Sequence, residues 1–331
     1  MVYSAETLAA RVLGAAQLSS TPGVFWASGH AASVAEALAQ HVRRFHVLAV
    51  HGELPDLTSA AGASLADELL LAAEALALSC RSPAVATDAL RTCRSLSCSV
   101  ALSATSTFVL SLADAPERRV RAAAAALDAL GGVKKCPGDN RAAVGRALVK
   151  AGASVRDAAR EVHEIAASAS EDGCAAPSQQ ADDEDDTEYD ATASASEAVV
   201  AYTALPLHNA SLAILQPVFR WLLTSAEPAE GDAALCGLLD ELHASYFVLA
   251  GDIESCTAAL WPPQEVELIV SYAQAVSGRA SGFVAAARAA GCCGDAAISL
   301  DALAEAVVAA AHDLVVACAT QGLADTRLEQ A

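Results

Sequence analysis

The chain has 331 residues and a formal net charge of −20, from 20 basic and 40 acidic residues. This balance excludes non-specific nucleic-acid binding and adsorption to an anionic membrane surface, because both need clustered Lys and Arg. Hydrophobic residues make up 54% of the chain, aromatic residues only 4%, and about a quarter of all positions are Ala. Because Ala favours helices and is depleted from strands, the composition predicts an all-α protein without a sheet.

The N-terminal half has the apolar periodicity of helices separated by short breaks. The predicted helices cover 24–51, 63–80, 85–112 and 117–130, and the last is expected to stop at Gly131-Gly132. The segment Pro137-Gly138-Asp139-Asn140 predicts a turn and an N-cap for a long helix over 141–169. Apolar residues at alternating spacings of four and three predict one buried face on that helix: Val144, Leu148, Ala151, Val155, Ala158, Val162 and Ile165.

A run of acidic residues separates the two halves. There is no Lys or Arg between Arg160 and Arg220, and nine of the twenty residues from 171 to 190 are acidic. Such a run repels itself and buries nothing, so we expect a disordered linker over 171–194 between helical bundles at 1–170 and 195–331. A docking segment regulated by phosphorylation is the alternative to a plain solubilising linker. Its candidate residues are Thr187, Asp182, Asp183, Glu184, Asp185 and Asp186.

The C-terminal half predicts four helices packed as a bundle, over 196–226, 235–260, 266–287 and 299–318. Pro206 and Pro217 should bend or break the first helix, and Pro262-Pro263 should end the second. Tyr202, Tyr246 and Tyr272 lie at bundle-interface spacing and are expected in the core. The second helix carries a stripe with alternating spacings of four and three: Leu239, Leu242, Tyr246, Leu249, Ile253, Cys256 and Leu260.

No catalytic or cofactor motif occurs in the sequence. It has no P-loop, GxGxxG, GxSxG or HExxH motif, and no ExxH of the kind that di-iron bundles use. His41, His46 and His51 are five residues apart, which places them on different faces of a helix. The ten Cys have no CxxC or zinc spacing, so we expect free thiols in a reducing compartment. Cys292-Cys293, between two glycines, is expected in an exposed turn where a redox role stays open.

Two uncharged stretches have nearly the length of a membrane span, but both are polar. Residues 95–113 contain eight Ser or Thr, and residues 198–219 contain two Pro with His208, Asn209 and Gln216. We therefore expect no membrane span and no targeting segment. These features together predict a soluble, non-enzymatic protein without a cofactor.

A residue pair and two groups of residues, in order along the chain, carry a family resemblance. Phe25-Trp26 precedes the first group, which is Pro137-Gly138-Asp139-Asn140-Arg141-Ala142-Ala143 followed by Val155-Arg156-Asp157-Ala158 and Glu161. The later group is Leu239-Asp240, Asp252-Ile253 and Leu260-Trp261-Pro262-Pro263. In order, spacing and the acidic insert between them, these segments resemble the cyclin-D1-binding protein 1 family, also called Grap2-and-cyclin-D-interacting proteins. Trp261 stands where that family usually has Tyr, and Arg141 where it usually has Lys.

The resemblance implies two packed bundles of long antiparallel helices, similar to those of vinculin and α-catenin. It implies a cytoplasmic and nuclear protein that binds D-type cyclins, helix-loop-helix factors or signalling adaptors and restrains cell-cycle progression or transcription. The alternative is a vinculin-like or α-catenin-like scaffold that binds cytoskeletal or signalling partners. The matched positions are Pro137, Asp139, Asn140, Asp157, Asp252, Pro262 and Pro263. A structural role, as helix caps and helix stops, also explains such residues.

Overall fold

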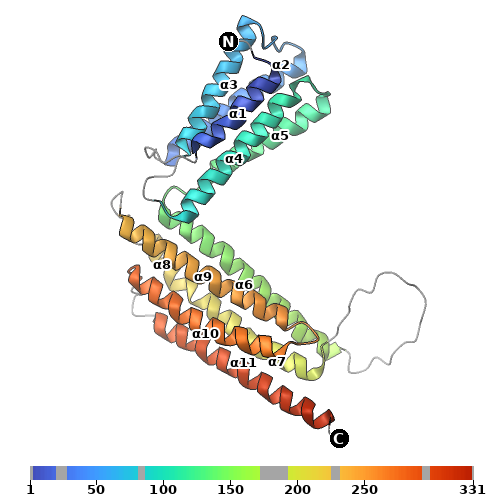
Figure 1. The fold of residues 1–331 in the computed structure, drawn as a ribbon, viewed down its shortest axis with the longest axis vertical. Coiled ribbons are helices and arrows are strands. Elements are labelled where there is room, and N and C mark those ends of the chain that lie inside the picture. The colour runs from blue at the N-terminus through green and yellow to red at the C-terminus, as the bar shows by residue number, and fades with distance from the viewer. Residues whose placement is uncertain are drawn as a thin grey trace, which may run out of the picture. The chain divides into compact units, whose positions relative to one another are not determined.

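The computed structural model describes residues 3–19, 28–80, 86–171, 193–224, 232–292 and 299–329, and every regular element in these ranges is helical (Figure 1). The all-α prediction is confirmed. The helices are α1 (Ala5–Ser19), α2 (Ser28–His51), α3 (Ala60–Ser79), α4 (Asp88–Leu110), α5 (Pro116–Val133), α6 (Asn140–Glu171), α7 (Ala195–Ala213), α8 (Leu215–Thr224), α9 (Ala233–Ala259), α10 (Val266–Ala289) and α11 (Leu300–Glu329), with a 3-10 turn η1 (Ser111–Ala113) after α4.

The chain forms two compact units, and their division differs from the predicted one. Unit 1 is Met1–Val144 with Pro228–Gly237, and unit 2 is Gly145–Glu227 with Leu238–Ala331. The sequence predicted the boundary at the acidic run 171–194, whereas most of α6 belongs to the same unit as α7 to α11. An acidic run marks a segment that buries nothing, and a loop between two helices of one bundle also satisfies that condition. The predicted disorder at 171–194 falls almost wholly outside the described residues.

Unit 1 is a ring of helices around an apolar core. Helix α1 packs against α3 and α4, α2 packs against α3 and α5, and α4 packs against α5, which closes the ring. Each of the five helices contributes a fully buried leucine to this core: Leu8, Leu38, Leu69, Leu102 and Leu130. The sequence analysis assigned no helix to α1, although Leu8, Val12 and Ala15 follow the helical spacing and are buried.

Unit 2 buries the stripes that the sequence predicted. All seven stripe residues of α6 and all seven of α9 are buried. Helix α11 packs against α7 and α10, and Tyr246 of α9 meets Phe283 of α10 with ring centroids 5.1 Å apart. The expectation that Tyr202 lies in the core was wrong, because its side chain is on the solvent face of α7. Tyr272 is half-buried.

Helix ends agree with the sequence where a cap or a proline sets them, with two exceptions. Helix α7 continues through Pro206, and the break predicted for this segment falls at Ile214, between α7 and α8. Pro217 is the third residue of α8, where a backbone N–H would have no partner within the helix. Gly131 and Gly132 do not stop α5, which ends at Val133. Glycine lowers helix propensity by only about 1 kcal/mol, which the packing of α5 offsets.

A buried histidine links α7 to α9. His208 Nδ1 lies 2.9 Å from the Ala204 carbonyl oxygen, which can only accept, so Nδ1 carries the proton. Nε2 lies 2.8 Å from the Thr257 hydroxyl oxygen, and this hydroxyl donates to the Ile253 carbonyl oxygen at 3.1 Å. Burial lowers the pKa of His208 below its ordinary value and keeps the ring neutral, while the bond to Ala204 acts in the opposite direction.

Substitutions at two glycines test how closely the backbone of unit 1 is packed. A Cβ on Gly62 would overlap the backbone carbonyl of Asp56, whereas a Cβ on Gly131 would meet nothing within 4 Å. We expect Gly62→Ala to lower the free energy of unfolding by about 2 kcal/mol or more. Gly131→Ala should raise it by roughly 0.5–1 kcal/mol through helix propensity. Urea denaturation of both variants measures this, and equal effects of the same sign would contradict the packing at Gly62.

His208 predicts a pH dependence of stability. The unfolded chain takes up a proton near pH 6.5, but the buried ring takes it up only at lower pH, so stability is lost as pH falls below about 6.5. The slope contributed by this group approaches about 1.4 kcal/mol per pH unit. Urea denaturation between pH 7 and 5.5 should show a shallower slope for His208→Gln than for the wild-type chain. The matched variant His163→Gln, on an exposed position of α6, should keep the wild-type slope, and a wild-type slope in His208→Gln would refute this account.

Candidate functional site

The first motif segment forms the start of α6. The Asp139 carboxylate accepts the Ala142 backbone N–H at 2.7 Å, and the Asp139 carbonyl oxygen accepts the Ala143 N–H at 3.1 Å. Asp139 is therefore the N-cap and satisfies donors that the helix itself cannot pair. The predicted cap is confirmed, although Asn140 is already the first residue of α6.

The Asn140 side chain joins the starts of three helices in unit 1. Its Oδ1 accepts the backbone N–H of Thr87 at 2.8 Å, and its Nδ2 donates to the Cys236 sulfur at 3.0 Å. Thr87 is the N-cap of α4 and Cys236 lies in the first turn of α9. Ala86, Leu90 and Ala143 form a small buried cluster in the same region. The amide therefore acts as a structural connector among α4, α6 and α9.

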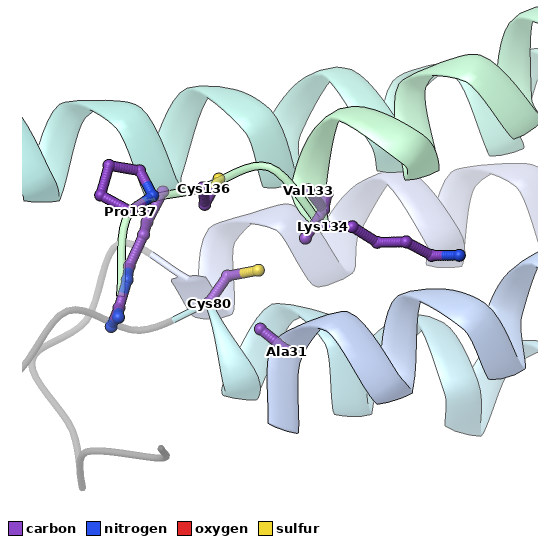
Figure 2. Close-up of a pocket in the computed structure, with 7 residues that line it drawn as sticks. Ala31, Cys80, Val133, Lys134, Cys136 and Pro137 are labelled. Carbon is purple, nitrogen blue, oxygen red and sulfur yellow. The ribbon is translucent and has the colours of Figure 1, made fainter. Parts of the chain in front are cut away.

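Next to this junction, a buried arginine lies among four thiols. The Arg94 guanidinium donates to the Gly138 carbonyl oxygen at 3.1 Å. Cys80, Cys93 and Cys136 lie close enough to raise the Arg94 pKa, although burial outweighs them and lowers it. Cys98 donates a hydrogen bond that lowers the pKa of Cys80 against the effect of burial, and Arg94 adds to that lowering. Cys80 and Cys136 both line a small pocket of about 20 Å³ (Figure 2).

These thiols do not form a metal site. Within the described ranges, no three His, Cys, Asp or Glu side chains come together in a way that could hold a metal ion. That statement includes His41, His46 and His51 along α2, as well as the four thiols around Arg94. The chemistry available to this cluster is that of thiols beside a cation.

Directly after the second motif group, Gln264 joins the connection between α9 and α10 to the start of α7. Ser194 and Glu197 form a capping box at the start of α7. Gln264 donates its backbone N–H to the Glu197 carboxylate at 3.0 Å and its side-chain amide to the Glu197 carbonyl oxygen at 2.8 Å. Burial opposes ionisation of Glu197, but the N–H groups of Ser194 and Gln264 outweigh it and lower the Glu197 pKa.

The remaining motif positions end a helix, form ion pairs or lie beside the Arg94 pocket. Helix α9 ends at Ala259, before Pro262 and Pro263, so the predicted stop is confirmed. Asp252 of α9 pairs with Arg279 of α10 at 3.5 Å. Asp157 is exposed on α6 and lies 3.6 Å from Arg160. Pro137 is buried beside the Arg94 pocket.

Exposed apolar side chains occur at the end of unit 2 where Gln264 meets Glu197. Val199 and Tyr202, one turn apart on α7, are 62% and 68% exposed. Trp261, on the α9–α10 connection, is 50% exposed, and Leu268 in the first turn of α10 is 41% exposed. We call these four exposed residues, each within five positions of Glu197 or Gln264 along the chain, the apolar corner. The sequence analysis did not single them out as a surface, because the periodicity of α7 does not reveal which face its neighbours cover.

Several predicted positions lie elsewhere or outside the described residues. Cys292 was expected in an exposed turn, but it is buried and its thiol donates to the Pro217 carbonyl oxygen at 3.6 Å. Cys293 lies outside the described residues, as do Phe25, Trp26 and the candidate docking residues Asp182 to Asp186 and Thr187.

Three helical segments are long and apolar enough to cross a membrane by length and composition alone. They are Ala195–Thr224, Ala233–Ala259 and Leu300–Gln321. The first contains the stretch 198–219 that the sequence analysis set aside as too polar. Length and composition therefore do not by themselves support the predicted absence of a span. Searches for similarity add no assignment, because no family model and no curated protein matches the chain.

Substitutions at two motif positions distinguish a structural role from a role at the surface. Asn140→Ala leaves the buried N–H of Thr87 without its acceptor, so we expect unit 1 to lose about 1–3 kcal/mol of stability. Asp157→Ala removes only an exposed ion pair and should change stability by less than about 0.5 kcal/mol. Denaturation monitored by circular dichroism measures both, and a neutral Asn140→Ala would refute the junction.

Proposed function

We propose that the protein is a non-enzymatic interaction protein that binds D-type cyclins or helix-loop-helix factors and thereby restrains cell-cycle progression or transcription. The motif resemblance supports this choice of partners. The observation that carries it on the molecule is the exposure of the apolar corner, because Trp261 belongs to the second motif group and its side chain is 50% exposed. Aromatic residues are enriched among the side chains that contribute most to binding at protein interfaces.

The chemistry of the corner defines a suitable partner. Exposed Glu265 and Glu267 lie between Trp261 and Leu268 in the sequence, and the whole chain carries a charge of −20. A helix with an apolar face flanked by Lys or Arg complements such a surface. The apolar residues supply affinity, and the opposite charges speed association and select the partner.

The motif positions that cap and connect helices have a structural role in this proposal, whereas the apolar corner has a binding role. Asp139 and Asn140 hold helix starts in place, so in this proposal they position surfaces and do not contact a partner themselves. Binding is then assigned to exposed side chains nearby. A docking role for the acidic segment with Thr187 is a separate part of the proposal.

We propose a cytoplasmic and nuclear location without a membrane span. Helix α9 carries Asp240, Glu241, Asp252 and Glu254, and charged side chains are costly in a bilayer. His208 of α7 and Thr257 of α9 bond to each other inside unit 2. These features suit helices that pack in water with one apolar face inward.

Binding to a purified D-type cyclin and to a purified helix-loop-helix domain tests the proposal. We expect the double variant Trp261→Ala/Tyr202→Ser to weaken binding by about tenfold or more. Phe247→Ser is the matched control, because Phe247 is equally exposed on α9 but lies outside the corner, and it should bind like the wild-type chain. Isothermal titration calorimetry measures all three.

Two other outcomes would change the proposed contact site or the proposed function. Loss of binding after deletion of 172–192, with the corner variant unchanged, would move the contact to the acidic segment. Cosedimentation with actin filaments and no binding to either purified partner would replace the proposal with the scaffold alternative.

A further inference from the structure

We propose that Cys93 and Cys136 form an oxidation-sensitive dithiol that closes to an intramolecular disulfide and locks α4 to the α5–α6 connection. This inference is independent of the proposed function. It rests on the placement of two thiols that the sequence separates by 43 positions and that unit 1 brings together.

The two sulfurs are already in contact. The Cys93 Sγ lies 4.0 Å from the Cys136 Sγ, and the Cys136 thiol lies 3.9 Å from the carbonyl oxygen of Cys93. A disulfide needs a sulfur–sulfur distance of about 2.05 Å, so each sulfur must move by about 1 Å, which side-chain rotation supplies. Both side chains are half-buried, whereas Cys80 and Cys98 are buried. A small oxidant therefore has access to this pair first.

The surroundings distinguish the two thiols of this pair. Arg94 follows Cys93 directly in α4, and the two thiols lie within electrostatic range of its guanidinium. The thiolate is the form of a cysteine that reacts with oxidants. Burial raises the pKa of Cys136 to about 11, so Cys136 remains a thiol at neutral pH. We therefore assign Cys93 as the thiol that reacts first and Cys136 as the resolving thiol.

The reaction balances with hydrogen peroxide as the oxidant. The Cys93 thiolate attacks one peroxide oxygen, the O–O bond breaks, and the products are a Cys93 sulfenic acid and hydroxide, which takes up a proton to give water. The Cys136 sulfur then attacks the sulfenic sulfur, and the S–O bond breaks. The hydroxide released takes the thiol proton as a second water. Two thiols are oxidised by two electrons and one peroxide is reduced.

Thiols in unit 2 provide an internal comparison. Cys256 of α9 and Cys318 of α11 are buried, and burial raises their pKa values to about 12 and about 11. Neither side chain is accessible to solvent. We expect them to stay reduced under conditions that close the pair in unit 1.

Peptide mapping of the full chain tests the proposal without any substitution. Trypsin releases Cys93 in the peptide Thr92–Arg94 and Cys136 in Cys136–Arg141, whereas Cys80 and Cys98 fall in other peptides. After treatment with hydrogen peroxide and alkylation of free thiols, we expect these two short peptides linked to each other and lighter by two hydrogens. Cys80 lines the same pocket as Cys136, so a Cys80–Cys136 link would overturn the assignment, as would free Cys93 and Cys136 in the oxidised protein.

Variants give a second readout. The wild-type Tm should rise by roughly 5–10 °C on oxidation, because the bond closes a loop of more than forty residues in the unfolded chain. Cys93→Ser and Cys136→Ser should lose this rise, and the control Cys318→Ser should keep it. A wild-type Tm that does not rise when the link is present would show that the bond does not lock unit 1.

Discussion

Burial of narrow apolar stripes is the constraint on which both units depend. An Ala-rich helix offers little apolar area per residue, so each helix must bury its whole stripe and approach its neighbours closely. On α6 the stripe alternates Ala151 and Ala158 with larger residues such as Val155 and Val162, and all of them are buried. Small residues bring the backbones together, and the larger residues fill the space between them.

Because the stripes are similar to one another, polar connections decide which helix starts meet. Asn140 selects the starts of α4 and α9, Arg94 fixes the α5–α6 connection, and Gln264 holds the start of α7. A buried polar group costs free energy unless it is paired, so these contacts penalise alternative arrangements. Of these three residues, Asn140 belongs to the segments that carry the family resemblance, and its pairing is a structural reason for its place there.

The sequence predicted the helices well and the units less well. Periodicity located α2 to α11 and the buried faces of α6 and α9, because one-sided burial is a local pattern. It could not show that α6 belongs with α7 to α11, since that depends on contacts such as Gly152 with Leu215. Exposure of Tyr202 and burial of Cys292 depend on neighbouring helices in the same way. The Cys93–Cys136 contact could not be predicted from the sequence, because no local spacing joins two positions so far apart.

The motif junctions connect helices, and we propose the apolar corner as the binding surface. Hydrogen exchange of the chain, alone and with a purified helix-loop-helix domain, tests that division most directly. We expect the partner to protect amides in 197–203 and 260–269, and to leave those of 139–143 unchanged. Protection at 139–143 without change at the corner would contradict the account.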